Sequence, residues 1–127
     1  MIFGEGDDDR LFGEGGDDFI EGGAGNDFAV GGEGDDHFRA TAGDGDDAYY
    51  GDDVSGGTGT DTLDMSAILA DITVDLGTGL GGRGMAASAT SGSDVLWNIE
   101  NFIGGAGDDV ITAGRAVNVM DGGAGDD

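Results

Sequence analysis

The sequence has 127 residues, and its 28 acidic side chains against 4 Lys and Arg give a formal net charge of −24. A chain this acidic repels nucleic acid and anionic membranes and attracts cations, so neither of the first two is expected as a partner. It has 30 Gly and no Cys, which excludes disulfides and thiolate metal sites and leaves oxygen atoms as metal ligands. The length suits one domain, and no apolar run reaches membrane-spanning length.

The first half of the chain repeats every nine residues. With Gly22 as position 1, the units cover residues 4–12, 13–21, 22–30, 31–39, 42–50 and 56–64. Position 6 is always aspartate, in Asp9, Asp18, Asp27, Asp36, Asp47 and Asp61. Position 8 is always uncharged, in Leu11, Ile20, Ala29, Phe38, Tyr49 and Leu63. A flexible acidic linker, which composition alone favours, has no reason to keep position 8 apolar, so the repeats predict a folded array.

The residue types at each position of the unit predict its local structure. Glycine at positions 1, 2 and 4 allows a tight turn that directs carbonyl oxygens inward. Positions 7 to 9 suit a brief strand with position 8 facing the interior. Two units then form one coil, and stacked coils place parallel strands side by side. We therefore predict an all-β fold, a parallel β-roll (β-solenoid) of stacked nonapeptide repeats with a non-repeat β insertion.

Stacking also predicts a cation site at each turn. The position-6 carboxylate of one unit comes close to that of the unit two further on, and the two repel unless a cation lies between them. Calcium accepts six to eight oxygens from carboxylates and backbone carbonyls, whereas magnesium prefers a smaller octahedron and retains its waters. The turns therefore favour several calcium ions over magnesium.

Residues 65–103, here called the connector, do not follow the nine-residue pattern. Ile72, Val74 and Leu76 alternate as in an ordinary strand, and the Gly-rich residues 77–84 predict a loop. Residues 93–105, SDVLWNIENFIGG, predict one further strand segment that brings Phe102 to the interior. Trp97 could stack on a ligand, but among apolar neighbours it is more often a packing anchor.

The repeat resumes after the connector. Units cover residues 104–112 and 113–121, and a ninth unit starts at Gly122, which places Asp109 and Asp127 at position 6. Unit 113–121 has lost most of its glycines and has Asn118 at position 6, so a poor or empty site is expected there. The expected parts are a first repeat block at 1–64, the connector packing on it, and a second repeat block at 104–127.

These units resemble the RTX (repeats-in-toxin, haemolysin-type) calcium-binding nonapeptide G-G-x-G-x-D-x-U-x, over residues 4–64 and 104–127. The resemblance implies a β-roll in which each ion lies between two turns of the same edge. One turn supplies the carbonyls of positions 2 and 4 and its aspartate, and the next supplies those of positions 1 and 3 and its aspartate.

Carried over to this sequence, the resemblance implies five ligand sets. At the start they are Glu5, Asp7 and Asp9 with Gly22, Ala24 and Asp27, then Glu14, Gly16 and Asp18 with Gly31, Glu33 and Asp36. Further on they are Gly23, Gly25 and Asp27 with Ala42, Asp44 and Asp47, then Gly32, Gly34 and Asp36 with Gly56, Thr58 and Asp61, and finally Gly105, Gly107 and Asp109 with Gly122, Ala124 and Asp127. Because acidic residues replace glycines at Glu5, Asp7 and Glu14, distorted first turns are expected.

The resemblance implies a module that crosses a type I secretion machine unfolded, folds on binding calcium outside the cell or at the bacterial surface, and stabilises adjacent domains of a larger secreted protein. The open ends of the roll invite end-to-end association. The alternative is an extracellular surface that recognises polysaccharide or an adhesin-type ligand, although outward positions 7 and 9 are chemically mixed. No catalytic constellation is present, so an enzyme is not expected, and His37 at position 7 reads as a surface residue.

Overall fold

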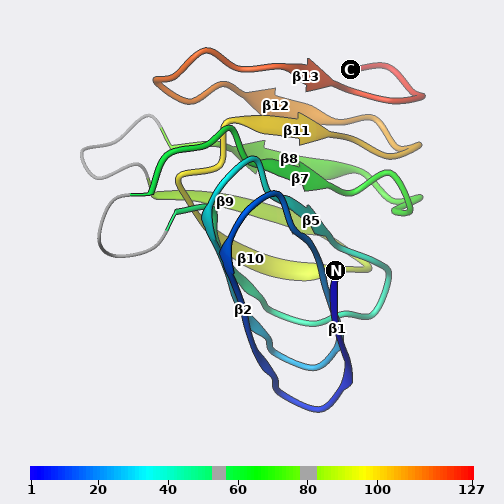
Figure 1. The fold of residues 1–127 in the computed structure, drawn as a ribbon. Coiled ribbons are helices and arrows are strands. Elements are labelled where there is room, and N and C mark those ends of the chain that lie inside the picture. Colours follow the sequence, from blue (N-terminus) through cyan, green and yellow to red (C-terminus); the bar gives the residue numbers. More distant parts are fainter. Residues whose placement is uncertain (53–56, 78–82) are drawn as a thin grey trace.

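The computed structural model describes residues 1–52, 57–77 and 83–127, and these form strands and turns without any helix. The strands make two sheets, and successive coils of the chain stack from the N-terminal to the C-terminal end (Figure 1). The described part of the chain therefore contains no helix able to span a membrane. The expectation of an all-β protein is confirmed.

One sheet has six strands and is parallel throughout. Its order is β1 (Ile2–Gly6), β3 (Phe19–Ala24), β5 (His37–Arg39), β7 (Thr62–Asp64), β11 (Asn101–Ile103) and β13 (Met120–Asp121). Ile20 of β3 pairs with Ile2 on one side and Phe38 on the other. Strands from every second repeat unit therefore become neighbours, as the coil model requires.

The other sheet has seven strands and is mixed. Its order is β12 (Val110–Thr112), β8 (Ile72–Asp75), β9 (Arg83–Ser88), β10 (Gly92–Trp97), β6 (Ala48–Tyr50), β4 (Phe28–Glu33) and β2 (Arg10–Gly15). Strand β9 is antiparallel to both neighbours, and the remaining pairs are parallel. Because two antiparallel steps restore the direction, β8 and β10 run the same way as the repeat strands. The repeat strands of this sheet are parallel as expected, and its two antiparallel pairs both involve the connector strand β9, so the sheet as a whole is mixed.

The connector differs from its predicted elements in two respects. Arg83 and Gly84, expected in a loop, begin β9, and the rest of that loop, residues 78–82, lies outside the described residues. The segment expected to form one strand gives two, β10 and β11, which belong to different sheets. Asn98, with a φ of 51°, lies between them in the left-handed region that permits a sharp turn.

The core lies between the two sheets and consists of the inward side chains of successive coils. All six position-8 residues of the first repeat block are buried, as are connector residues from β8, β10 and β11: Leu11, Ile20, Ala29, Phe38, Tyr49, Leu63, Ile72, Val74, Leu96 and Phe102. The predicted inward position of Phe102 is confirmed. Ile111 of the second block is only partly buried. One continuous core therefore joins the first repeat block and the connector.

Candidate metal sites

Aspartates form a hydrogen-bonded ladder along the turns that lead into the seven-stranded sheet. The backbone N–H of Asp9 donates to Asp27 Oδ1 at 2.8 Å, and the N–H of Asp27 donates to Asp47 Oδ1 at 2.8 Å. The ladder continues into the connector, where the N–H of Asp47 donates to Asp94 Oδ1 at 3.1 Å. Each carboxylate is thereby fixed by the turn before it in the stack.

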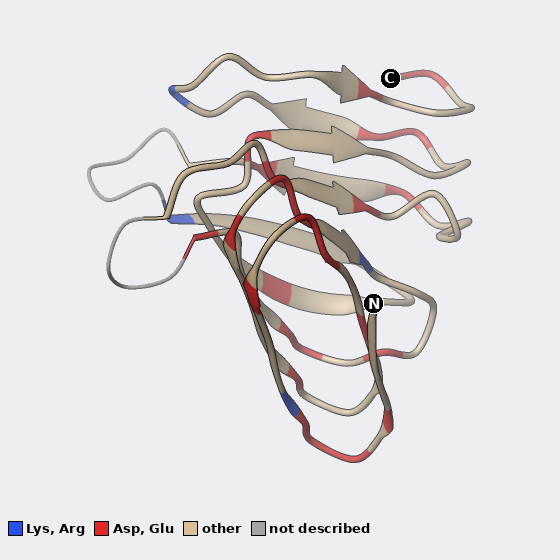
Figure 2. Ribbon diagram, in the orientation of Figure 1, with Lys and Arg blue, Asp and Glu red and all other residues tan. Residues whose placement is uncertain are grey.

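A second ladder of the same kind runs along the turns that lead into the six-stranded sheet. The N–H of Asp18 donates to Asp36 Oδ1, and that of Asp36 donates to Asp61 Oδ1, both at 2.9 Å. The N–H of Asp61 donates to Glu100 Oε2 at 3.0 Å. Acidic residues consequently line both edges of the stack (Figure 2).

The last coil contributes a shorter ladder. Asp109 Oδ1 accepts the N–H of Ile72 at 2.9 Å, and the N–H of Asp109 donates to Asp127 Oδ1 at 3.0 Å. Ile72 occupies the place of a position-6 aspartate on β8, so no carboxylate continues the ladder there. The carboxylates of Asp94 and Asp109 are thus separated by β9 and β8 in the sheet order.

The residues at position 5 form an outer ladder of hydrogen bonds that the sequence analysis missed. In this ladder the N–H of the later unit donates to the side chain of the earlier one, which is the opposite of the position-6 ladders. The N–H of Asn26 donates to Asp8 Oδ1, and that of Asp46 donates to Asn26 Oδ1, both at 2.9 Å. The same pattern links Asp35 with Asp17, Thr60 with Asp35, Asp108 with Asp71, and Asp126 with Asp108. Position 5 is acidic in most units, so column counting could have found it. Asn26 accepts the N–H of Asp46 with a neutral amide oxygen, so the acceptor in this ladder needs no charge.

Most of the position-6 carboxylates, and Asp94 of the connector, are buried without basic partners among the described residues. Within the described ranges, no arginine, lysine or histidine forms an ion pair with the buried Asp27, Asp36, Asp47, Asp61, Asp94 or Asp109. Of the described ion pairs, Met1 N⁺ lies 3.3 Å from Asp18 and His37 lies 3.1 Å from Asp64, both on less buried groups. Burying a carboxylate without a counterion is costly, so these residues favour a bound cation.

Several carboxylate oxygens also lack hydrogen-bond partners. In the described part of the chain these buried atoms include Asp9 Oδ2, Asp27 Oδ2, Asp36 Oδ2, Asp94 Oδ2 and Asp44 Oδ1. Burial raises the pKa of Asp61 to about 7 and that of Asp94 to about 8, and neighbouring carboxylates add to the effect. Burial likewise raises the pKa of Asp44 to about 6. Unpartnered anionic oxygens of this kind are ligands for a hard cation.

Backbone carbonyls lie beside these carboxylates because glycines let adjacent turns approach closely. A Cβ added to Gly25, whose φ is 140°, would stand 2.4 Å from the carbonyl oxygen of Asp7, which no real side chain tolerates. Glu5, Asp7 and Glu14 adopt positive φ values of 77°, 72° and 70°. The first turns therefore retain the glycine-type backbone instead of the expected distortion, at a cost of roughly 1–2 kcal/mol per residue.

These oxygens fit calcium better than a metal that needs several side chains. No three acidic or histidine side chains converge into one metal-binding group anywhere in residues 1–52, 57–77 and 83–127. An ion between two turns would instead combine one or two carboxylates with carbonyl oxygens, which calcium accepts. The donor set is entirely oxygen, in agreement with the absence of cysteine.

A family model for the RTX calcium-binding nonapeptide repeat matches this chain in four copies, over residues 3–38 and 98–127, together more than half of its length. The chain belongs to this family. A search of curated proteins finds no match to the chain as a whole. Membership makes this RTX chain a calcium-binding module, and the matched repeats contain the turns described above.

The structure brings together the turns that the resemblance pairs in this RTX chain. Glu5 pairs with Gly23, and Glu14 pairs with Gly32. The N–H of Gly25 donates to Asp44 O at 2.7 Å and that of Gly34 donates to Thr58 O at 3.2 Å, while Gly56 lies outside the described residues. At the C-terminal end, the N–H of Ala124 donates to Gly105 O at 2.9 Å. Their roles as calcium ligands remain predictions.

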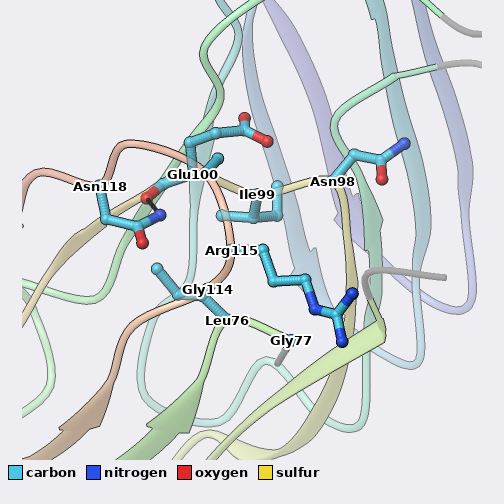
Figure 3. Close-up of a pocket in the computed structure, with 9 residues that line it drawn as sticks. Leu76, Gly77, Asn98, Ile99, Glu100, Gly114, Arg115 and Asn118 are labelled. Carbon is cyan, nitrogen blue, oxygen red and sulfur yellow. Dashed lines mark hydrogen bonds between the residues drawn. The ribbon is translucent and has the colours of Figure 1, made fainter. Parts of the chain in front are cut away.

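The turn of unit 113–121 differs from the others. Asn118 Nδ2 donates to the backbone oxygen of Glu100, so this ladder of carboxylates ends at Glu100. A cavity of about 170 Å³ lies between this turn and the connector, and in Figure 3 the Arg115 side chain extends across it toward Gly77. Asn118 thus uses its side chain to bind a backbone carbonyl, and the expectation of a poor or empty site at this turn stays a prediction.

The sequence analysis missed Asp94 and Glu100, which extend the two ladders. Each precedes an alternating strand in the manner of position 6, since Leu96 and Phe102 follow two residues later and are buried. That spacing was visible in the sequence. The turns before Asp94 and Glu100 lack most of the RTX glycines, so they match only the last four positions of the motif.

Proposed function

We propose that this RTX chain is a calcium-triggered folding module whose two sheets form the walls of a β-roll. The observation that carries the proposal is the row of buried position-6 aspartates without basic partners among the described residues. Without calcium these charges repel one another and oppose stacking of the coils. With calcium they become ligands, so the same residues that destabilise the empty fold stabilise the loaded one.

Several ions would bind, each between successive turns of one edge. The proposed ligands are the five sets given by the resemblance, of which the set containing Gly56 includes one residue outside the described ranges. Interior aspartates such as Asp27 and Asp36 belong to two sets each, so neighbouring ions share ligands. Each site at a calcium concentration one hundred times its Kd adds about 2.7 kcal/mol to the free energy of unfolding. Shared ligands make folding cooperative.

A calcium trigger suits export. At low cytosolic calcium the chain would remain extended and pass through a type I secretion machine, and it would fold in extracellular calcium of about millimolar concentration. It would then stabilise adjacent domains of a larger secreted or surface protein, with no catalytic role of its own. The blocks 1–64 and 104–127 would act as calcium-loaded stacks joined by the connector, and exposed strand edges could support end-to-end association.

A calcium titration tests this function. Circular dichroism of the whole chain should show little β structure in chelator and a steep gain as calcium is added, with magnesium at the same concentrations having little effect. β structure that is already complete in chelator at neutral pH would contradict the proposal. Calorimetric titration would give the number of ions.

A second candidate function, recognition of a glycan or adhesin-type ligand, is favoured by an aromatic row on the outer face of the seven-stranded sheet. Phe12, Phe28, Tyr50 and Trp97 lie on four adjacent strands, with centroid distances of 6.1, 5.1 and 6.0 Å between successive rings. The outward positions that looked mixed in the sequence thus align in space. However, Tyr50 and Trp97 stack face to face with an interplanar angle of 10°, which occupies one face of each ring.

Glycan binding by the calcium-loaded chain would test this candidate. Binding that disappears in Phe12→Ala, which is exposed and outside the core, while the calcium response is retained, would support a ligand surface. The absence of binding across a broad glycan array would leave the row with a packing role.

A further inference from the structure

We propose that Asp94 in the connector completes an additional calcium site, formed with Asp47 at the junction of β6 and β10. This inference rests on the proposed calcium function and extends it to a turn without the repeat motif. Residues 39–97 lie outside the matched family ranges. The turn before Asp94, residues 89–93 or ATSGS, has one glycine. Sequence comparison therefore assigns no ligand here.

The connector turn nevertheless stacks on the turn of unit 42–50 as another repeat would. β10 is parallel to β6, with Leu96 opposite Tyr49 and Trp97 opposite Tyr50. The N–H of Val95 donates to Asp47 O at 2.8 Å. In the outer ladder, the N–H of Ser93 donates to Asp46 Oδ1 at 2.9 Å. Both ladders of the repeat array thus pass into the connector without a change in pattern.

The one glycine of this turn lies where close approach demands it. Gly92 has a φ of 97°, and a Cβ there would stand 2.1 Å from the carbonyl oxygen of Gly45. Gly45 makes the equivalent approach to Gly25, with a φ of 117° and a distance of 2.2 Å. The carbonyls of the 42–47 turn therefore lie against the connector turn as closely as carbonyls lie between genuine repeats.

Asp94 accepts the same hydrogen bond as the position-6 aspartates through one carboxylate oxygen, and its other oxygen is available to bind a cation. Its side chain is 0% exposed. Oδ1 accepts the N–H of Asp47 at 3.1 Å, whereas Oδ2 is buried and has no hydrogen-bond partner among the described residues. A completely buried carboxylate oxygen without a donor is rare in folded proteins, so Asp94 Oδ2 is a candidate ligand for a cation.

The surrounding charges select a cation. Asp44 and Asp47 are buried in the turn next to Asp94, and Asp44 Oδ1 also lacks a partner in the described part of the chain. Asp47 Oδ2 accepts the hydroxyl of the buried Tyr49 at 2.7 Å, which satisfies one oxygen but neutralises no charge. Asp47 and Asp94 would be the carboxylate ligands, the 42–47 turn would supply carbonyls, and Asp44 would add negative charge.

The junction contains its own spectroscopic reporter. Trp97, the single tryptophan of the chain, lies three residues after Asp94 on β10 and stacks on Tyr50 of β6. Docking of β10 on β6 should therefore change tryptophan fluorescence. The emission reports this junction, while circular dichroism reports the whole stack.

The test compares the whole chain with Asp94→Asn, and with Asp46→Asn as a matched control that removes the same charge from an exposed position of the neighbouring turn. An amide already occupies the column of Asp46 at Asn26, which accepts the N–H of Asp46. We expect Asp94→Asn to bind one calcium ion fewer by calorimetry. Its Trp97 transition should need at least tenfold more calcium while the β signal still responds. Asp46→Asn should behave as wild type.

An unchanged ion count and an unchanged Trp97 midpoint in Asp94→Asn would overturn the inference. If that variant does not fold, Asp94→Glu decides, because it retains the charge and displaces the carboxylate by one methylene. A weakened junction site in a folded Asp94→Glu supports the site, and full wild-type binding overturns it. Failure of the wild-type chain to bind calcium would refute the proposed function itself, which distinguishes the two results.

Discussion

The first repeat block and the connector build similar coils from different sequences. In the repeat block the coils have most of the turn glycines, together with position-6 aspartates and inward apolar residues, whereas the connector has only Gly92, Asp94 and Leu96 at the equivalent places of β10. Yet β10 joins β6 with the parallel register that joins β6 to β4. In β10, one close-approach glycine, one carboxylate that accepts an amide and one buried apolar side chain therefore accompany the same stacking as in the full repeats.

The two regions differ in the continuity of their carboxylates. In the repeat block each edge has an aspartate in every coil, but the connector inserts β9 and β8 between Asp94 and Asp109, with Ile72 at the ladder position of β8. A calcium array cannot run without interruption through these strands. In the proposed function the connector would thus separate the two calcium-binding repeat blocks by a layer held by its apolar core, and this contrast can be tested.

The largest expected effect is that of pH on the calcium-free chain. Burial raises the pKa values of three carboxylates most, to about 8 for Asp94 and about 6 for Asp44 at the junction, and to about 7 for Asp61 in the turn before β7. The pKa of these carboxyl groups in the unfolded chain is 3.8. Between pH 3.8 and the raised folded-state pKa values, the folded chain therefore binds more protons than the unfolded chain. Its stability is greatest at low pH and falls as pH rises through the folded-state values. Acidification from about pH 8 to about pH 5 should therefore increase the β structure of the chain in calcium-free buffer.

Saturating calcium should abolish or reverse this dependence, because the metal binds ionised carboxylates and competes with protons. Circular dichroism at a series of pH values, with and without calcium, measures both trends. Loss of β structure on acidification of the calcium-free chain would show that the buried carboxylates do not control the empty fold.

The next largest effect is expected inside the repeat block, for Asp36→Asn. Asp36 belongs to two proposed ligand sets, so its loss should lower the free energy of unfolding by about 5 kcal/mol at one hundred times the Kd of each site. Its exposed neighbour provides the control, because Asp35→Asn retains an oxygen that can accept the N–H of Thr60. Urea unfolding at fixed calcium measures both. Equal effects of the two variants would mean that charge alone, and not ligation, matters.

Much of the fold was predictable from the sequence because the nine-residue register fixes which side chains share a column. Position 8 correctly identified the core residues of the first block, and position 6 correctly placed aspartates of alternate units side by side. The register also shows where coils stack, since hydrogen bonds at these columns join residues 18 apart wherever the repeat is uninterrupted.

The connector was less predictable because its determinants are tertiary. Arg83 and Gly84 belong to a Gly-rich stretch that reads as a loop, yet β9 forms because both edges of its hydrogen-bonding ladder are paired with β8 and β10. Asp94 acquires its importance only from Asp47, which is 47 residues away in the sequence. The spacing of Asp94 and Leu96 is visible locally, but no local pattern specifies which turn Asp94 contacts.

Core truncation should distinguish the two repeat blocks. Phe38→Ala removes a fully buried ring between the sheets and should cost about 3–5 kcal/mol. Ile111→Ala, at the same position of a less covered coil, should cost less than the roughly 2–5 kcal/mol of a fully buried site. Thermal unfolding in saturating calcium measures the difference. Similar costs would show that the last coil is packed as tightly as the first.

Glycine-to-alanine substitutions, which add a single Cβ atom, test whether the junction turn packs as closely as the repeat turns. Gly92→Ala and Gly45→Ala each combine a positive φ with a Cβ next to a carbonyl oxygen, so each should cost at least the roughly 1–3 kcal/mol of an overpacked site. Gly43→Ala has a φ of 85° but no atom within 4 Å, so only backbone strain of roughly 1–2 kcal/mol applies. A Gly92→Ala variant as stable as Gly43→Ala would indicate that the connector turn does not lie against Gly45 in solution.

The smallest effect is expected for Tyr49→Phe, which removes one hydroxyl group at the junction. Phe38, which occupies position 8 of the preceding unit, has no hydroxyl, so the variant makes position 8 at the junction resemble that of the preceding unit. The tyrosine donates to Asp47 Oδ2 at 2.7 Å and is buried, so its removal should cost about 1–2 kcal/mol without calcium. When calcium is bound, the ion satisfies Asp47 in place of the hydroxyl, and the cost should shrink. Urea unfolding of the two proteins, at pH 5 without calcium and at neutral pH with it, gives both values. A cost that is larger in calcium would mean that the hydroxyl orients Asp47 for the ion, which would make Tyr49 a positioning residue of the junction site.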